Sequence, residues 1–208
     1  RKFSVCDKDD TFVMTSNIKK SCRMITLYVN QKWPVLLCGP AGAGKSSLIN
    51  KLARDAGIHV LSLQMDDQVD GKTLVGSYVC TEQPGEFRWQ HGSLTQAVIY
   101  GYWVVLEDID KASPDVHSVL VPLLEGASSF ATTHGEEIQV NDKFRIFSSV
   151  SVPKCNEVAN VSNTYSLNNV WRRVMVDLPS LDDVCDIVKS LYPELQSLVG
   201  RLLGTINH

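Results

Sequence analysis

The sequence lacks an excess of positive charge, and it lacks any apolar run long enough to cross a membrane. Its 208 residues carry 20 Lys and Arg against 23 Asp and Glu, a net charge of −3. General affinity for nucleic acid or an anionic membrane requires a cationic surface. A membrane-spanning helix requires roughly 20 consecutive apolar residues. We therefore expect this chain to bind neither nucleic acid nor a membrane directly.

Closely spaced cysteines are absent as well. The six cysteines, at positions 6, 22, 38, 80, 155 and 185, are at least 16 residues apart. Zinc sites built on CxxC pairs and compact disulfide frameworks both require shorter spacings. The five histidines are also scattered. The sequence therefore predicts neither a zinc site nor a fold that depends on disulfides.

A complete phosphate-binding loop is the strongest positive signal. It has the pattern G-x-x-x-x-G-K-[ST], an apolar run at 35–38 precedes it, and helical apolar spacing follows it at 47–56. The glycines let backbone N–H groups turn toward phosphate oxygens, and the following helix contributes its positive end. In this pattern the lysine reaches the β- and γ-phosphates, and the serine hydroxyl binds Mg²⁺. The predicted nucleotide-binding residues are Gly39, Pro40, Ala41, Gly42, Ala43, Gly44, Lys45, Ser46 and Ser47.

A pair of acids follows the apolar run 102–106. Glu107 and Asp108 stand at its carboxyl end, about sixty residues after the phosphate-binding loop, and an extra strand at 58–64 lies between. ATP hydrolysis needs one acid that holds Mg²⁺ through water and another that orients and deprotonates the attacking water. This layout is typical of the additional-strand type of P-loop ATPase. A Ras-type GTPase is a minor alternative because the N-K-x-D segment is missing, and a small-molecule kinase is another because no arginine-rich lid is visible.

Strand patterns alternate with helix patterns along the chain, which predicts an α/β fold with a parallel sheet. A polar stretch at 153–169 is expected to be a loop. The expected helices are 17–31 with a cap at Ser16 or Asn17, 47–56, 93–101, one that starts at Pro114, and one that opens with a Ser180–Asp183 capping box. The expected strands are 35–38, 59–63, 102–106, 144–152 and 174–178, and hairpins are expected at 86–92 and 128–142.

Several segments resemble AAA+ modules of the dynein-related, MoxR-like branch, and most specifically those of the midasin family, whose members carry six such modules in one chain. The segments are 34–49, 74–78, 87–89, 92–94, 101–116 and 120–125. The resemblance implies a P-loop NTPase core with a five-stranded parallel sheet in the order 5-1-4-3-2, flanked by helices. It also implies an AAA+ core over residues 1–179 and the beginning of a helical lid over 180–208.

The resemblance also implies a role for individual residues. Glu107 takes the place of the family's Mg²⁺-binding Asp, and Asp108 that of its catalytic Glu, so the usual order of the two acids is reversed. The metal would be bound by Ser46 directly and by Glu107 through water. The sensor position aligns with Ser151, for which Ser148 or Ser149 could substitute. The arginine that serves a neighbouring module's ATP is assigned to Arg173, with Arg172 as the alternative.

The implied function is that of an ATP- and Mg²⁺-dependent module in a ring of neighbouring modules in the same chain. Through other parts of the parent protein, such a ring removes assembly factors from pre-60S ribosomal particles in the nucleus. Two alternatives stay open. The module could be a structural subunit that binds nucleotide without turnover, which the reversed acids and the sensor serine favour. It could also be a MoxR-type chaperone that inserts metal into a partner enzyme or activates it.

Overall fold

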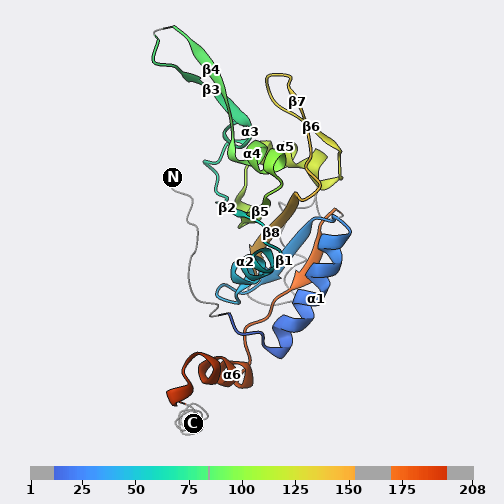
Figure 1. The fold of residues 1–208 in the computed structure, drawn as a ribbon, viewed down its shortest axis with the longest axis vertical. Coiled ribbons are helices and arrows are strands. Elements are labelled where there is room, and N and C mark those ends of the chain that lie inside the picture. The colour runs from blue at the N-terminus through green and yellow to red at the C-terminus, as the bar shows by residue number, and fades with distance from the viewer. Residues whose placement is uncertain (1–11, 84, 153–169, 196–208) are drawn as a thin grey trace.

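A computed structural model describes residues 12–83, 85–152 and 170–195 of the chain (Figure 1). Its main sheet has five parallel strands: β1 (Val35–Gly39), β2 (Val60–Gln64), β5 (Trp103–Glu107), β8 (Arg145–Ser151) and β9 (Arg172–Met175). They lie in the order β2-β5-β8-β1-β9. If these five strands are numbered 1 to 5 along the chain, the order read from the β9 edge is 5-1-4-3-2. The predicted α/β fold and strand order are therefore confirmed.

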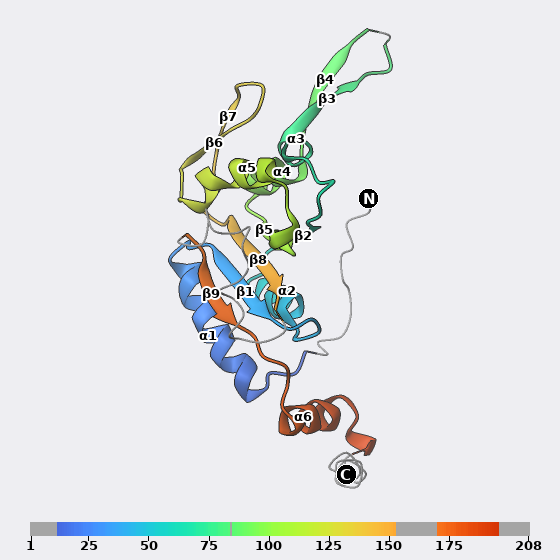
Figure 2. The ribbon, with the colours of Figure 1, turned by 180° about the vertical axis from the view of Figure 1, so that it is seen from behind.

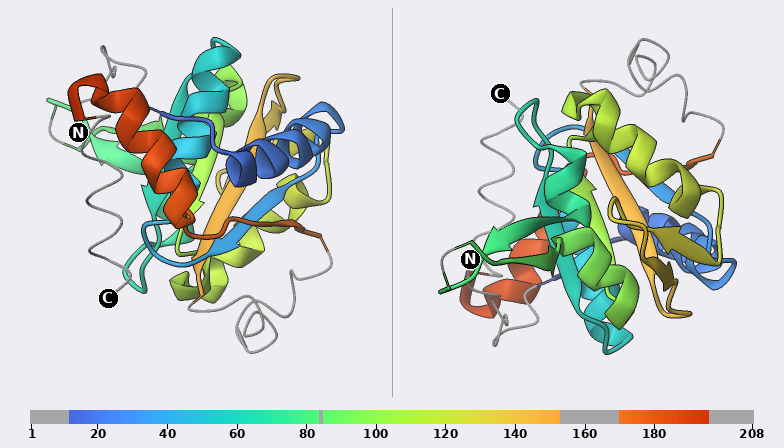
Figure 3. Two further views of the ribbon diagram at one scale, coloured as in Figure 1. Left: turned by 90° about the horizontal axis from the view of Figure 1, so that it is seen from below. Right: turned by 90° about the horizontal axis from the view of Figure 1, so that it is seen from above.

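Helices cover both faces of the sheet (Figure 3). On one face, α1 (Ser16–Asn30) and α2 (Lys45–Asp55) pack against the side chains of Val35 and Leu37. On the other face, α4 (Ser93–Tyr100) and α5 (Pro114–Leu124) pack against Leu36 and Cys38. Alternate residues of β1 thus point into two separate cores, and all five residues of the strand are buried. This explains why β1 reads in the sequence as an uninterrupted apolar run.

Two antiparallel hairpins extend from the α4–α5 side of the molecule (Figures 1 and 2). The first pairs β3 (Gly76–Cys80) with β4 (Phe87–His91), and the second pairs β6 (Ser129–Ala131) with β7 (Glu137–Gln139). The ring centroids of Trp89 and His134 are 4.2 Å apart, so the two hairpins touch. The hairpin expected at 128–142 is confirmed. The one expected within 86–92 is wrong, because residues 87–91 form a single strand, β4, whose partner is the preceding strand β3.

Several element boundaries differ from the predictions. The last strand covers 172–175 and not 174–178, because it pairs with β1 from Val35 onward. The N-cap of α1 is Thr15 and not Ser16 or Asn17, and it makes no side-chain capping bond. A short helix, α3 (Gly71–Val75), was not predicted; Asp70 caps it by accepting a hydrogen bond from the Lys72 N–H.

The chain ends, within the described part, with a short helix and a 3₁₀ turn. The helix α6 (Leu181–Leu191) begins with the predicted capping box between Ser180 and Asp183, which is confirmed. The turn is η4 (Pro193–Leu195). The loop predicted at 153–169 lies outside the described residues, as do residues 196–208 of the predicted lid. The boundary between an AAA+ core at 1–179 and a lid at 180–208 stays a prediction. No described helix is both long and apolar enough to cross a membrane.

Gly39 is the point where the sheet constrains the phosphate-binding loop most tightly. A Cβ atom at this position would overlap the backbone carbonyl oxygen of Val176, the residue that follows β9. The two segments are held together by a hydrogen bond of 2.8 Å from the Val176 N–H to the Cys38 carbonyl oxygen. Only glycine allows this approach.

We predict that Gly39→Ala lowers the free energy of unfolding by about 1–3 kcal/mol, because the added methyl group forces β1 and the chain after β9 apart. Chemical denaturation of the chain measures this change. The matched control is Asn50→Ala on the exposed side of α2, which should change the free energy by less than about 0.5 kcal/mol. Equal stability of the two variants would mean that this contact is unimportant.

Candidate nucleotide-binding site

The phosphate-binding loop connects the end of β1 to the start of α2. Gly42 and Gly44 have φ angles of 80° and 85°, in the left-handed region that favours glycine. Gly44 is the N-cap of α2, and no side chain caps the helix there. The first backbone N–H groups of α2 therefore lack the usual side-chain acceptor. Together with the positive end of the helix dipole, they form a binding site suited to a phosphate group.

Lys45 is buried and lies back over the loop. Its Nζ donates hydrogen bonds to the carbonyl oxygens of Gly39 at 2.8 Å and Pro40 at 2.9 Å. Burial lowers the pKa of Lys45, and the nearby carboxylates of Asp108 and Glu107 oppose that shift. The ammonium group is thus held at the loop by two backbone oxygens and within electrostatic range of both predicted acids.

The two acids stand at the end of β5 and immediately after it. Glu107 is the last residue of the strand, and its carbonyl oxygen accepts a 2.8 Å hydrogen bond from the Met65 N–H. Asp108 follows with a φ angle of 55°, in the left-handed region, and begins the 3₁₀ turn η1 (Ile109–Lys111). The backbone therefore turns sharply at Asp108, directly after the strand.

The Asp108 carboxylate is held by two donors on one oxygen. Oδ2 accepts 3.0 Å and 2.8 Å hydrogen bonds, from Gln64 Nε2 and Lys111 Nζ respectively. Chiefly because of the Lys111 bond, the pKa of Asp108 lies below its usual value. The carboxylate is therefore ionised at neutral pH, the form that can accept a proton from water. Sequence reasoning identified neither Gln64 nor Lys111 as a partner of Asp108. Gln64 is brought opposite Glu107 only by the pairing of β2 with β5.

The three candidate sensor serines have different environments along β8. Ser148 is fully buried, and its hydroxyl donates to the Leu106 carbonyl oxygen at 3.0 Å. Ser149 is also buried, at 4% exposure. Ser151 is exposed at the end of the strand, directly opposite Gly39 in the pairing with β1. The position of Ser151 fits the sensor role best, and its function stays a prediction.

The two candidate arginines are the first residues of β9, not residues that precede the strand. Arg172 pairs with Val35 and Arg173 with Leu36, at the end of β1 opposite to the phosphate-binding loop. Successive side chains of a strand point to opposite faces. The Arg172 guanidinium lies over the Trp33 ring, 4.5 Å from its centroid. Arg173 acts electrostatically on Cys38, whose pKa is nevertheless raised because burial of the thiol dominates.

The structure thus brings the phosphate-binding loop, Glu107, Asp108 and Ser151 to the carboxyl edge of the sheet, and it places neither arginine there. Ser46 belongs to the first turn of α2. A serine hydroxyl and a carboxylate are oxygen donors of the kind that Mg²⁺ prefers. The donor set therefore fits the metal that accompanies a nucleoside triphosphate.

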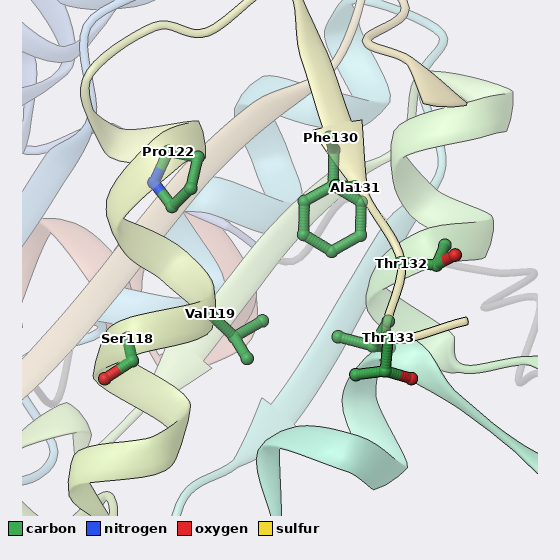
Figure 4. A pocket seen from close by; sticks show the side chains of 8 residues that line it. Ser118, Val119, Pro122, Phe130, Ala131, Thr132 and Thr133 are labelled. Carbon is green, nitrogen blue, oxygen red and sulfur yellow. The ribbon is translucent and has the colours of Figure 1, made fainter. Parts of the chain in front are cut away.

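A separate pocket of about 180 Å³ lies between α5 and the β6–β7 hairpin (Figure 4). No charged side chain lines it, which makes it unsuitable for a triphosphate. Its lining residues are Val75, Ser118, Val119, Pro122, Phe130, Ala131, Thr132 and Thr133.

Comparison with known proteins concerns the family of this chain. The family model "AAA domain (dynein-related subfamily)" matches residues 34–172. The chain is 33% identical over 196 residues to midasin of Dictyostelium discoideum, covering 94% of this chain and 3% of that protein. It is 32% identical to the protein NorQ of Paracoccus denitrificans, covering 56% of this chain and 43% of that protein. The chain therefore spans only a small part of the midasin and less than half of NorQ.

The fold also matches a solved structure. A putative ATPase from Cytophaga hutchinsonii superposes with a TM-score of 0.60 at 12% identity, covering 83% of this chain and 50% of that one. At this identity the likeness concerns the fold alone. The match of the family model over most of the described sheet, together with the similarity to midasin, confirms the resemblance seen in the sequence. The chain belongs to the dynein-related subfamily of AAA domains.

Proposed function

We propose that this chain is an ATP-binding and ATP-hydrolysing module that works with a neighbouring module. The observation that carries the proposal is the strand order, which brings the phosphate-binding loop with Lys45 and the acids Glu107 and Asp108 to one carboxyl edge of the sheet. A phosphate-binding lysine and a pair of acids in this relation provide the two halves of a triphosphate hydrolysis site. Membership of the AAA family agrees with this chemistry.

In the bound state, the backbone N–H groups of the loop and the start of α2 would surround the phosphates. Lys45 would exchange its two carbonyl partners for oxygens of the β- and γ-phosphates. Ser46 and, through water, Glu107 would hold Mg²⁺, which neutralises charge on the phosphates. These contacts position the triphosphate and stabilise the negative charge of the transition state.

Hydrolysis would use Asp108 as the proton acceptor. The oxygen of a water molecule forms a bond to the γ-phosphorus, the bond from that phosphorus to the β-γ bridging oxygen breaks, and the water proton passes to the Asp108 carboxylate. The products are ADP and inorganic phosphate. Because Asp is one methylene shorter than Glu, we expect the carboxylate to reach the water less well, and the rate to be low.

An arginine from another module would complete the site. The backbones of Arg172 and Arg173 lie at the opposite end of β1 from the phosphate-binding loop, which favours a role in the site of a neighbour. Of the two, we assign the role in a neighbour's site to Arg173. Arg172 stays the alternative, and its guanidinium lies over the Trp33 ring, 4.5 Å from the centroid.

The similarity to midasin extends the proposal to a ring of such modules within one long chain, located in the nucleus, that removes assembly factors from pre-60S particles. Two alternatives have support. A structural module that binds nucleotide without turnover is favoured by the reversed acids and by a serine at the sensor position. A MoxR-type chaperone is favoured by similarity to NorQ and to the gas vesicle ATPase GvpN of Ancylobacter aquaticus.

We predict that Lys45→Ala weakens ATP binding about 10- to 100-fold, because it removes a charged donor worth about 1.5–3 kcal/mol to the phosphates. Titration of the chain with a fluorescent ATP analogue measures the dissociation constant. The matched control is Lys51→Ala in the same helix, where Lys51 pairs with Asp55 at 2.9 Å; its affinity should equal that of the wild type. Unchanged affinity of Lys45→Ala would refute the assignment of the loop.

We predict that Asp108→Asn, introduced into the full-length parent protein, removes this module's share of ATP turnover and leaves nucleotide binding intact. Loss of a general base typically lowers a rate about 10²- to 10⁴-fold. Steady-state phosphate release measures turnover, and the control is Asp115→Asn on the exposed first turn of α5. Unchanged turnover, with ATP still bound at this site, would support the structural alternative instead.

We predict that Arg173→Ala in the parent protein lowers turnover by the share of one neighbouring site, whereas Arg172→Ala does not. Arg172→Ala should instead reduce stability by about 0.5–1 kcal/mol through loss of the contact with Trp33. Phosphate release and thermal unfolding of both variants separate the two effects. Loss of turnover in Arg172→Ala alone would exchange the two assignments.

A further inference from the structure

Lys111 contacts the predicted catalytic carboxylate, and neither the family match nor the sequence assigns it a role. Its Nζ lies 2.8 Å from Asp108 Oδ2, three residues earlier in the chain. The Lys111 side chain is 60% exposed, whereas that of Asp108 is 22% exposed. Gln64 Nε2 reaches the same Oδ2 atom at 3.0 Å. One oxygen of Asp108 therefore accepts both bonds, and together they determine the orientation of the carboxylate.

The direction in which this oxygen is held follows from the strand order. Within the sheet, β5 has β2 on one side and β8, followed by β1, on the other (Figure 2). The Gln64 side chain comes from the end of β2, on the far side of β5 from the phosphate-binding loop. Lys111 closes the η1 turn and binds the same atom. The two contacts thus fix Oδ2 between the end of β2 and the η1 turn.

We propose that Lys111 is a positioning residue that restrains Asp108 in this orientation and thereby slows ATP hydrolysis at this site. The inference rests on the proposed function, because it assumes that Asp108 receives the proton of the attacking water. As that proton passes to the carboxylate, the water oxygen bonds to the γ-phosphorus and the bond from phosphorus to ADP breaks. The carboxylate can accept the proton on Oδ2 only after this oxygen has lost its ammonium partner. It can accept the proton on Oδ1 only from the direction in which the two bonds to Oδ2 hold the group.

The restraint is weak and can therefore be released during turnover. An ion pair with an exposed lysine contributes up to about 1 kcal/mol. Breaking it before each proton transfer would cost about a two- to five-fold decrease in rate. Lys111 does not contact the phosphate-binding loop in the described part of the chain, so its removal should change the rate and not the binding of ATP.

The test is to compare Lys111→Met with the wild type in the full-length parent protein, by steady-state phosphate release. The turnover of this site is obtained as the difference from a variant that also carries Asp108→Asn. We expect kcat at this site to rise about two- to five-fold with unchanged KM. Lys111→Arg, which keeps the charge and can keep the bond, should stay near the wild-type rate. Lys72→Met, on the exposed side of α3, is the control for loss of a surface lysine.

A lower or unchanged kcat in Lys111→Met would overturn the inference while leaving the proposed function in place, provided that Asp108→Asn still lowers turnover. If Asp108→Asn has no effect in either background, the proposed function fails and this inference fails with it. A raised KM in Lys111→Met would also contradict it, since the lysine would then contribute to ATP binding. Thermal unfolding of each variant identifies a loss of fold.

Discussion

The position of β1 between β8 and β9 is the constraint on which the rest of the site depends. Parallel pairing on both sides fixes the end of β1 next to Ser151 on one strand and next to the chain that leaves β9 on the other. Gly39, at that end, has no room for a side chain. The phosphate-binding loop therefore begins from a rigid base, and the orientation of α2 follows from it.

Charge at the carboxyl edge of the sheet is balanced by contacts within the chain. Lys45 is buried and charged, which is costly without partners, and two backbone carbonyls together with two nearby carboxylates compensate for it. Asp108 is compensated in turn by Gln64 and Lys111. A bound triphosphate would have to compete with these internal partners. Their geometry therefore affects both the affinity for nucleotide and the rate of the chemistry.

The sequence predicted those features that depend on local patterns. The phosphate-binding loop, the apolar strands and the Ser180–Asp183 capping box each follow from residue types at short spacing, and the strand order followed from the family resemblance. Features that depend on pairing over long distances were missed. Residues 87–91 pair with residues 76–80, and the sequence of 76–80 has no alternation of apolar and polar residues that would predict a strand. The contact of Gln64 with Asp108 depends on the register between β2 and β5, which residue patterns do not encode.

The same sheet geometry explains why a single module would hold only part of a hydrolysis site. Parallel strands gather their carboxyl ends at one edge, and the loop, the acids and Ser151 all come from there. The arginines at the start of β9 are at the other end by the same rule. A chain built in this way carries its phosphate-binding loop at one end of the sheet and two arginines where β9 begins, at the other end. Under the proposed function, modules in a ring would join these two ends, and turnover at one site would then depend on the position of its neighbour.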